Sequence, residues 1–303
     1  PALVWRAFVG RWLVRAAVLA GAAAFGLAGA LPAQTGLLVV AHGAGPEWNQ
    51  RVREVVEGVS WGHGPVELAF LMGPEAEAAG WDVAVSALGK QGAASVVVVP
   101  LMVSSYGGHY RQIQYFAGEL DSLPPELLEH DHHAGMARPV PMRVTPALDG
   151  APEMVEGVVE RWRELGAADR GRPVLLVAHG PNDAEDSAHW LADLDAVAAG
   201  LSRAGAVGDV RSGLLRDDAL TPVRAEAVSL MRDTIQALAS RAHDSVVVMP
   251  VLISTGTIDR TKIPRDFEGL PVRYSAQPLA PLPQLARWIE RVAQDALLAP
   301  KER

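Results

Sequence analysis

The sequence of 303 residues contains no cysteine. This absence excludes disulfide bonds, thiolate nucleophiles and thiolate metal sites, so any metal must be bound by histidine, carboxylate or hydroxyl groups. The sequence also lacks an excess of positive charge, because 27 Lys and Arg stand against 35 Asp and Glu. The net charge of −8 therefore indicates that the protein has no nucleic-acid partner.

Two enzyme signatures are absent as well. The Gly-x-Gly-x-x-Gly pattern of dinucleotide-binding folds does not occur. Histidine phosphatases need Arg before their His-Gly pair, whereas Ala41 and Ala178 precede His42 and His179 here. We expect no organic cofactor.

Residues 1–34 differ from the rest of the chain. Three arginines, at positions 6, 11 and 15, precede an apolar run over 16–31 that ends in small residues. This pattern is typical of a secretory signal, and the run is short for a membrane-spanning helix. An uncleaved anchor and a mistaken start site are the alternatives. The segment predicts an exported protein, either periplasmic or membrane-anchored, whose only membrane contact is this segment; otherwise we expect the protein in the cytoplasm.

After Gln34, short apolar runs alternate with segments of helical periodicity. Such alternation indicates βα units and parallel sheets covered by helices on both faces, an α/β fold. We predict strands over 37–41, 65–72, 96–99, 138–144, 174–178, 209–215, 246–249 and 271–275. We predict helices over 47–59, 76–88, 152–165, 184–201, 223–238 and 282–298.

The pattern occurs twice. SVVVVP at 95–100 returns as SVVVMP at 245–250, and both LLVVAHG and VLLVAHG join a strand to a His-Gly pair. An internal repeat of this kind predicts two similar domains, at 35–170 and 171–303, with a cleft between them. The segment 121–138 is an insertion with histidines at 130, 132 and 133. These histidines either capture metal or are simply exposed to solvent.

Two histidines follow predicted strands of the first domain. His42 comes directly after the first strand, and His109 ends the loop after the third. Ligands of open α/β sheets bind at the carboxyl ends of the strands. Two imidazoles there can share one divalent metal, or one can bind metal while the other takes a proton. A single histidine at such a place could equally serve only to cap a turn.

The segments that carry these histidines resemble a known family. LLVVAHGAG, ELAFLMGPEAEAA and VVVVPLMVSSYGGHYRQ are similar to the class II tetrapyrrole chelatases, the sirohydrochlorin cobaltochelatases and ferrochelatases, and VLLVAHGPND and VVVMPVLISTG repeat the pattern. The resemblance implies a tetrapyrrole cleft between two parallel-sheet domains. It also implies insertion of Co²⁺ or Fe²⁺, and sometimes Ni²⁺, into sirohydrochlorin. By this resemblance His42 and His109 bind the metal and help to remove pyrrole protons.

The chain departs from the family pattern at three places. The acidic residue that ends the second strand falls on Met72, so Glu75 or Glu77 is the candidate acid. Tyr106 lengthens the loop before the second histidine. In the second half Ile258 stands where that histidine would be. We therefore expect the metal pair in the first half alone.

An anionic, carboxylated tetrapyrrole needs hydrogen-bond donors and cations. The second half is expected to contribute a wall of the cleft, and Arg111 could instead be a solvated residue at the start of a helix. The candidate substrate-binding residues are Ser104, Ser105, Tyr106, Gly107, Gly108, Arg111, His179 and Arg216.

A second function stays open. The chain could be an exported, non-catalytic protein that binds metal or tetrapyrrole on the chelatase scaffold. Met72 and the export signal favour this alternative, whereas the intact pair of His42 and His109 favours the enzyme, a chelatase of the lyase class. The sequence leaves the preferred metal open, and it is compatible with a homo-oligomer.

Overall fold

The computed structural model describes residues 34–123, 139–206 and 208–299. The predicted export signal before Gln34 lies outside these residues. So do the three histidines of the predicted insertion. Among the described residues, no helix combines the length and apolar character that crossing a bilayer requires.

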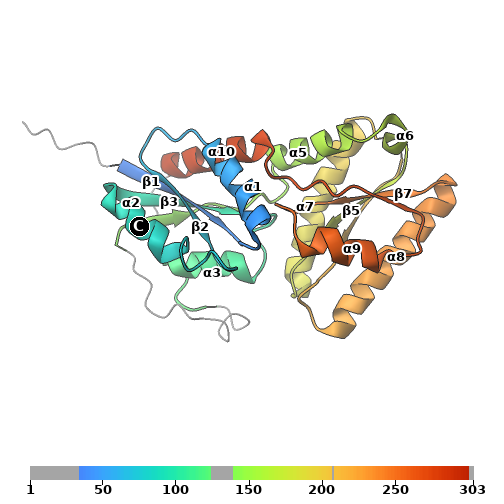
Figure 1. Cartoon of the computed structure of the whole chain (residues 1–303), viewed down its shortest axis with the longest axis horizontal. Helices are drawn as coiled ribbons and strands as arrows, with labels where there is room; N and C mark the ends of the chain where they lie inside the picture. Colours follow the sequence, from blue (N-terminus) through green and yellow to red (C-terminus); the bar gives the residue numbers. More distant parts are fainter. Residues whose placement is uncertain (1–33, 124–138, 207, 300–303) are drawn as a thin grey trace, which may run out of the picture. The chain divides into compact units, whose positions relative to one another are not determined.

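Two four-stranded parallel sheets form the framework (Figure 1). The first sheet has the order β2-β1-β3-β4 and the second the order β6-β5-β7-β8, so the topology is the same in both. The strands of the first sheet are β1 (Gln34–Ala41), β2 (Val66–Phe70), β3 (Ala93–Leu101) and β4 (Met142–Val144). Those of the second are β5 (Val174–Ala178), β6 (Val210–Leu214), β7 (Val246–Pro250) and β8 (Val272–Tyr274). The predicted α/β fold with parallel sheets is confirmed.

The central strands carry continuous apolar runs because helices cover both of their faces. Every residue of β5 is buried, and so are residues 36–41 of β1. The helices are α1 (Pro46–Glu57), α2 (Trp81–Lys90), α3 (Gly108–Ala117), α5 (Pro152–Arg163), α6 (Ala167–Arg170), α7 (Ala184–Arg203), α8 (Thr221–Ala242), α9 (Ile263–Asp266) and α10 (Pro283–Leu298). A π-helical turn, η1 (Ile258–Lys262), precedes α9.

The last helix packs on the first sheet. Side chains of α10, among them Trp288 and Ile289, share one buried core with β1, β3 and α1 and with strands of the second sheet. Figure 1 shows α10 in red beside α1 in blue. The predicted domain boundary at 170/171 assigns α10 to the second domain, although the helix packs on the sheet of the first. The sequence of an amphipathic helix does not show which sheet it covers.

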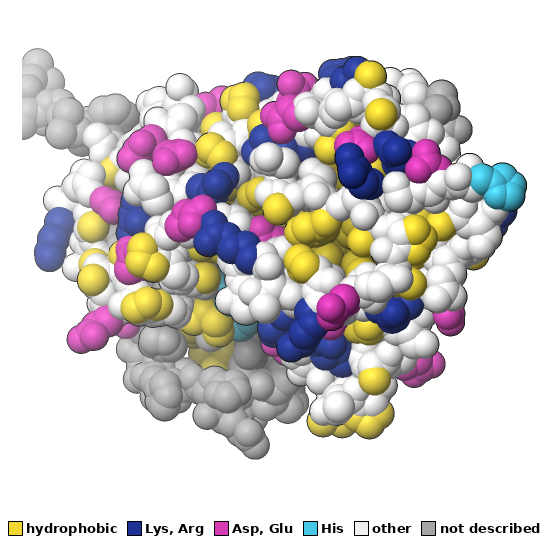
Figure 2. Space-filling model, turned by 45° about the vertical axis from the view of Figure 1, so that its right-hand side comes forward, with side chains coloured by type: hydrophobic (Ala, Val, Ile, Leu, Met, Phe, Trp, Pro, Cys, Tyr) yellow, Lys and Arg dark blue, Asp and Glu magenta, His cyan; other side chains and the backbone are white. Residues whose placement is uncertain are grey.

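Two smaller cores lie on the other faces of the sheets. Trp81 and Phe116 belong to the core under α2 and α3, and Ile235 and Phe267 to the core under α8 and α9. Apolar side chains also reach the surface, where Figure 2 shows them gathered on one face with charged side chains around them. Leu220 and Leu230, for example, are 79% and 68% exposed.

Several elements differ from the sequence prediction: the short elements α6, η1 and α9 were not predicted, and β4 is shorter than expected. The helix expected over 76–88 begins only at Trp81, because the chain first makes a series of turns that ends at Gly80. A Cβ atom at Gly80 would lie 2.3 Å from the carbonyl oxygen of Ala76, so only glycine fits this close turn. Helix α3 was not predicted. It begins directly after Gly107, whose φ of 154° is a conformation that glycine adopts readily.

Candidate metal centre at the strand ends

The structure brings His42 and His109 together. Their ring centroids are 4.9 Å apart and the rings are nearly perpendicular, at 82°. His42 follows β1, and His109 lies in the first turn of α3, after β3. Since β1 and β3 are parallel neighbours, their carboxyl ends meet at one edge of the sheet. This juxtaposition is the one that the sequence predicts.

The hydrogen bond of His42 fixes which ring nitrogen is free. Its Nδ1 lies 2.7 Å from the carbonyl oxygen of Gly43, and because a carbonyl only accepts, Nδ1 must donate. In the neutral ring, Nε2 then carries the lone pair. Burial, and next the neighbouring His109, lower the pKa of His42 to about 4. At neutral pH the imidazole is therefore uncharged, which is the form that binds a metal.

His109 has a similar arrangement. Its Nδ1 lies 3.2 Å from Oε1 of Gln112, one turn further along α3. Burial lowers the pKa of His109, against the opposing effects of Gln112 and Asp218. With Nδ1 engaged by an acceptor, Nε2 of His109 is also the atom that offers a lone pair. Trp48 borders the pair, with its ring centroid 6.4 Å from that of His42.

His179 occupies the equivalent strand end of the second sheet. It follows β5, and its Nδ1 lies 2.7 Å from the carbonyl oxygen of Gly180. Its Nε2 lies 3.2 Å from Oδ2 of Asp218. Burial disfavours the charged imidazole, but the hydrogen bond and charge of Asp218 outweigh it and raise the pKa of His179. His179 and Asp218 also affect the pKa of both His42 and His109, so the four groups form one electrostatic cluster.

Asp218 is a site residue that the sequence analysis missed. Among the described residues, His179, Asp217 and Asp218 form a group whose metal-ligand atoms lie within 4.8 Å of one another. Asp217 is almost fully buried, accepts a hydrogen bond from Nε of Arg224 at 3.0 Å and pairs with Lys262. These two cations already neutralise Asp217, which leaves His179 and Asp218 as the available pair. The signal in the sequence was the Asp-Asp pair just after the predicted strand over 209–215.

Glu75 and Glu77, the two predicted acids of the first half, do not take part in the contacts of the histidine pair that are described above. Glu75 forms an ion pair with Arg53 of α1, and this hydrogen bond, together with one to Asn49, lowers the pKa of Glu75. Neither Glu75 nor Glu77 is among the groups with the largest effects on the pKa of His42 or His109. The carboxylate that the structure places near the histidine pair is Asp218.

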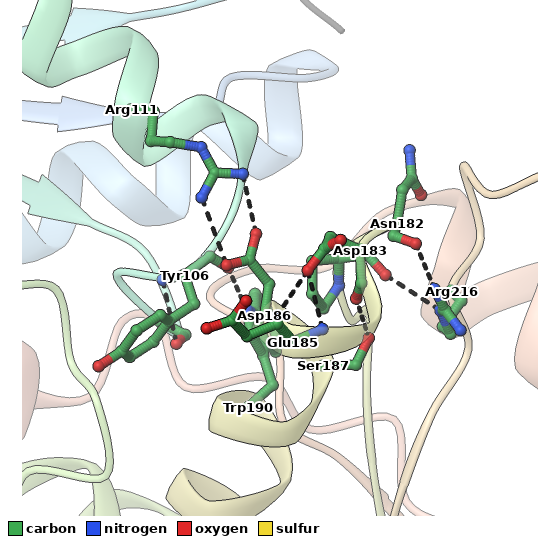
Figure 3. Close-up of polar contacts among 11 residues, drawn as sticks. Tyr106, Arg111, Asn182, Asp183, Glu185, Asp186, Ser187, Trp190 and Arg216 are labelled. Carbon is green, nitrogen blue, oxygen red and sulfur yellow. Dashed lines mark hydrogen bonds and ion pairs between the residues drawn. The ribbon is translucent and has the colours of Figure 1, made fainter. Parts of the chain in front are cut away.

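The two predicted substrate-binding arginines make contacts within the chain (Figure 3). Nη2 of Arg111 lies 2.8 Å from Oδ2 of Asp186, near the start of α7. Arg216 donates to the carbonyl oxygens of Pro181, at 3.3 Å, and Asn182. Arg216 thereby holds the loop after β5 that carries His179.

The loop before His109 is held by α7 and by a turn. Ser104 donates to Asp193 of α7 at 2.9 Å, and Ser105 donates its backbone N–H and its hydroxyl to Asp149, each at 2.5 Å. The Tyr106 ring stacks on His189 with centroids 3.8 Å apart, while its carbonyl accepts from Trp190 (Figure 3). These contacts position Gly107, Gly108 and His109. Binding of substrate by the loop stays a prediction.

Comparisons with known proteins agree with this picture. The CbiX family model matches residues 36–165. No curated protein matches the chain in sequence. SirB from Bacillus subtilis, solved with Fe³⁺, has a TM-score of 0.60 and 18% identity, over 86% of this chain and 95% of SirB. The sirohydrochlorin chelatase SirB of Bacillus subtilis subspecies spizizenii, in complex with cobalt, has a TM-score of 0.58 and 18% identity, over 88% and 97%.

A third solved structure is similar over its whole length. CbiX, described as the terminal enzyme of siroheme biosynthesis in denitrifying bacteria, has a TM-score of 0.53 and 16% identity, over 87% of this chain and 100% of that one. At these identities the solved structures establish the fold, and the family model covers the segment that holds both His42 and His109. The chain thus has the two-sheet fold of the solved sirohydrochlorin chelatases, and its residues 36–165 match the CbiX family model.

Proposed function

We propose that this protein inserts a divalent metal, Co²⁺ or Fe²⁺, into a tetrapyrrole such as sirohydrochlorin. The observation that carries the proposal is the pair of His42 and His109, two half-buried imidazoles whose ring centroids are 4.9 Å apart. The pKa of each is lowered, so each ring is neutral and offers Nε2. In this role the metal is a substrate rather than a resident cofactor.

A chelatase must hold its metal and then release it. Two neutral nitrogen ligands bind Co²⁺, Fe²⁺ or Ni²⁺, yet they leave most of the coordination positions open for the pyrrole nitrogens. A closed set of four protein ligands would compete with the macrocycle instead. Trp48 beside His42 provides an aromatic surface for an apolar macrocycle.

An insertion assay tests this proposal. The full chain, and residues 34–303 in parallel, would be mixed with sirohydrochlorin and Co²⁺, Fe²⁺ or Ni²⁺, and the change in the tetrapyrrole absorption would be followed. We expect a rate well above that of the protein-free mixture. A rate equal to that of the protein-free mixture with all three metals would reject the enzyme.

The alternative is an exported protein that binds metal or tetrapyrrole without catalysis. Met72 favours it, because the end of β2 lacks an acidic side chain. The same assay separates the two, since a binding protein would change the spectrum in a fixed ratio to protein and would not turn over. Export through residues 1–34 is part of this alternative, whereas the proposed enzyme is compatible with export or with the cytoplasm.

A further inference from the structure

Neutral His179 and the Asp218 carboxylate can bind one proton between them. Nδ1 of His179 donates to the carbonyl oxygen of Gly180 at 2.7 Å, so Nε2 of the neutral ring carries a lone pair. That lone pair faces Oδ2 of Asp218 at 3.2 Å, and a carboxylate also only accepts. One proton between them converts a contact of two acceptors into a charge-assisted hydrogen bond. The pair is therefore arranged to take up a proton.

Among the described residues of the first half, the equivalent strand-end histidine has no such partner. His42 makes the same bond to the glycine that follows it, also at 2.7 Å, but its neighbour is the ring of His109 rather than a carboxylate. A second imidazole does not stabilise a positive charge on the first. His42 is thus suited to bind a metal, and His179 is suited to accept a proton.

The two halves differ at matched positions. The backbone N–H of Met72 donates to the carbonyl oxygen of His42 at 2.9 Å, and that of Arg216 donates to His179 at 2.7 Å, so Met72 and Arg216 are equivalent. Two residues beyond Arg216 lies Asp218, whereas Gly73 and Pro74 follow Met72. The first half therefore lacks the carboxylate.

The second half lacks the other histidine. The backbone N–H of Arg111 donates to the carbonyl oxygen of Gly107, and the backbone N–H of Arg260 donates to that of Gly256. These equivalent hydrogen bonds align the two loops. The alignment puts Ile258 at the position of His109. The first half thus provides the two histidines, and the second half provides a histidine and the carboxylate, so the two halves complement each other.

We infer that His179 and Asp218 form the proton acceptor of the site, with Asp218 supplying from the second half the carboxylate that the first half lacks. This inference rests on the proposed function. Insertion breaks two pyrrole N–H bonds, leaves both electron pairs on nitrogen to bind the metal, and releases two protons. One proton passes to Nε2 of His179, where Asp218 holds it. His179 passes this proton to water beside the exposed Asp218 side chain and then accepts the second proton.

The exposure of the pair fits this role. The side chain of Asp218 is 68% exposed and that of His179 is 29% exposed, so a proton taken from the macrocycle can leave to water. An acceptor that must be emptied in each cycle needs contact with solvent, and the exposed Asp218 side chain provides it.

The test compares Asp218→Asn with wild type in the full chain. The amide keeps the size of the side chain and can donate to Nε2, which removes the reason for the ring to take a proton. We expect kcat for Co²⁺ insertion into sirohydrochlorin to fall about 100-fold. We expect the Kd for Co²⁺, measured by calorimetry, to stay within about threefold, because removing an acceptor removes no metal ligand.

Two further variants make the result specific. Glu226→Gln removes an exposed carboxylate on α8 and should leave both quantities unchanged. His179→Gln should match Asp218→Asn in kcat. NMR titration of the His179 ring should show its pKa fall in Asp218→Asn, which checks that the contact exists in solution. A merely structural role of the contact would not lower kcat while the Kd for Co²⁺ stays the same.

Each outcome decides between the proposals. If wild type inserts metal and Asp218→Asn keeps its kcat, the acceptor role is wrong while the proposed function stands. If Asp218→Asn loses Co²⁺ binding, Asp218 is a metal ligand and the inference is overturned. If wild type inserts no metal, the proposed function itself is rejected, and the inference that rests on it is rejected too.

Discussion

His42 and His179 lie at equivalent strand ends and make the same hydrogen bond, because Nδ1 of each lies 2.7 Å from the carbonyl oxygen of the following glycine. The backbone that holds them is also the same, since Gly43 and Gly180 adopt φ values of 83° and 75°. Their second neighbours differ: His42 contacts His109, and His179 contacts Asp218. One backbone motif therefore holds two histidines in different electrostatic surroundings.

The first prediction concerns Gly43, which sets the orientation of His42. Gly43→Ala should destabilise the fold by more than about 1 kcal/mol, because φ is positive there and a Cβ atom would lie 2.2 Å from the carbonyl oxygen of Met72. Urea unfolding measures the change. Gly89→Ala is the matched control in α2, where no atom lies within 4 Å of the added Cβ. It should be stabilising by about 0.5 kcal/mol, and equal effects in the two variants would contradict the argument.

The second prediction concerns the pH dependence of stability. Burial raises the pKa of Asp193 to about 6, Asp149 adds to the effect, and the hydrogen bond from Ser104 opposes it. Between the unfolded value of 3.8 and about 6, the folded state binds more protons than the unfolded state. This residue therefore makes the protein less stable as pH rises through that window.

Asp193→Asn removes that titration. The free energy of unfolding of the variant, relative to wild type, should increase between pH 4 and pH 6 and stay constant above pH 7. Urea unfolding at pH 4, 5, 6 and 7 measures it. Asp195→Asn, an exposed residue two positions along α7, is the control and should show no such change. A difference that does not vary with pH would show that folding does not shift the pKa of Asp193.

The third prediction concerns export. Residues 1–40 contain the arginines and the apolar run, and they should carry a fused reporter out of the cytoplasm. A reporter that is active only after export gives the readout. Replacing two Leu of the run with Lys should abolish the signal, because the run must be apolar to be recognised. A silent reporter with the wild-type segment, present in soluble form in the cytoplasm, removes the export proposal.

Much of the fold could be predicted because buried parallel strands appear in the sequence as continuous apolar runs. The apolar runs of β1 and β5 end at a His-Gly pair and those of β3 and β7 reach a Pro, and the meeting of His42 and His109 follows from β1 and β3 being neighbours. The role of Asp218 could not be predicted in this way. Its position beside His179 depends on how β5 and β6 end together, and its effect on His42 depends on contacts between residues far apart in sequence.

The contacts of Arg111 illustrate the same limit. An arginine beside a candidate site suggests an anion-binding group, yet in the structure its guanidinium pairs with Asp186, 75 residues away. Helix α10 is another example, because its amphipathic pattern predicts a buried face but not the sheet that buries it. Local periodicity in the sequence indicates where helices and strands lie. Contacts between residues far apart in sequence determine which polar side chains remain available to a substrate.

The last prediction concerns the asymmetry of the three histidines. His109→Ala should lose Co²⁺ binding by at least about 100-fold, because a lone imidazole holds a divalent ion weakly. His42→Ala should do the same. His179→Ala should leave Co²⁺ affinity nearly unchanged, because Ile258 provides no second nitrogen in that half and His179 is directed at Asp218. Calorimetric titration of the three variants measures this. His63→Ala is the control, since His63 is exposed and its Nε2 contacts Gln294 on α10. Loss of binding in His179→Ala, with His109→Ala unaffected, would place the metal in the second half and reverse the assignment of the two halves.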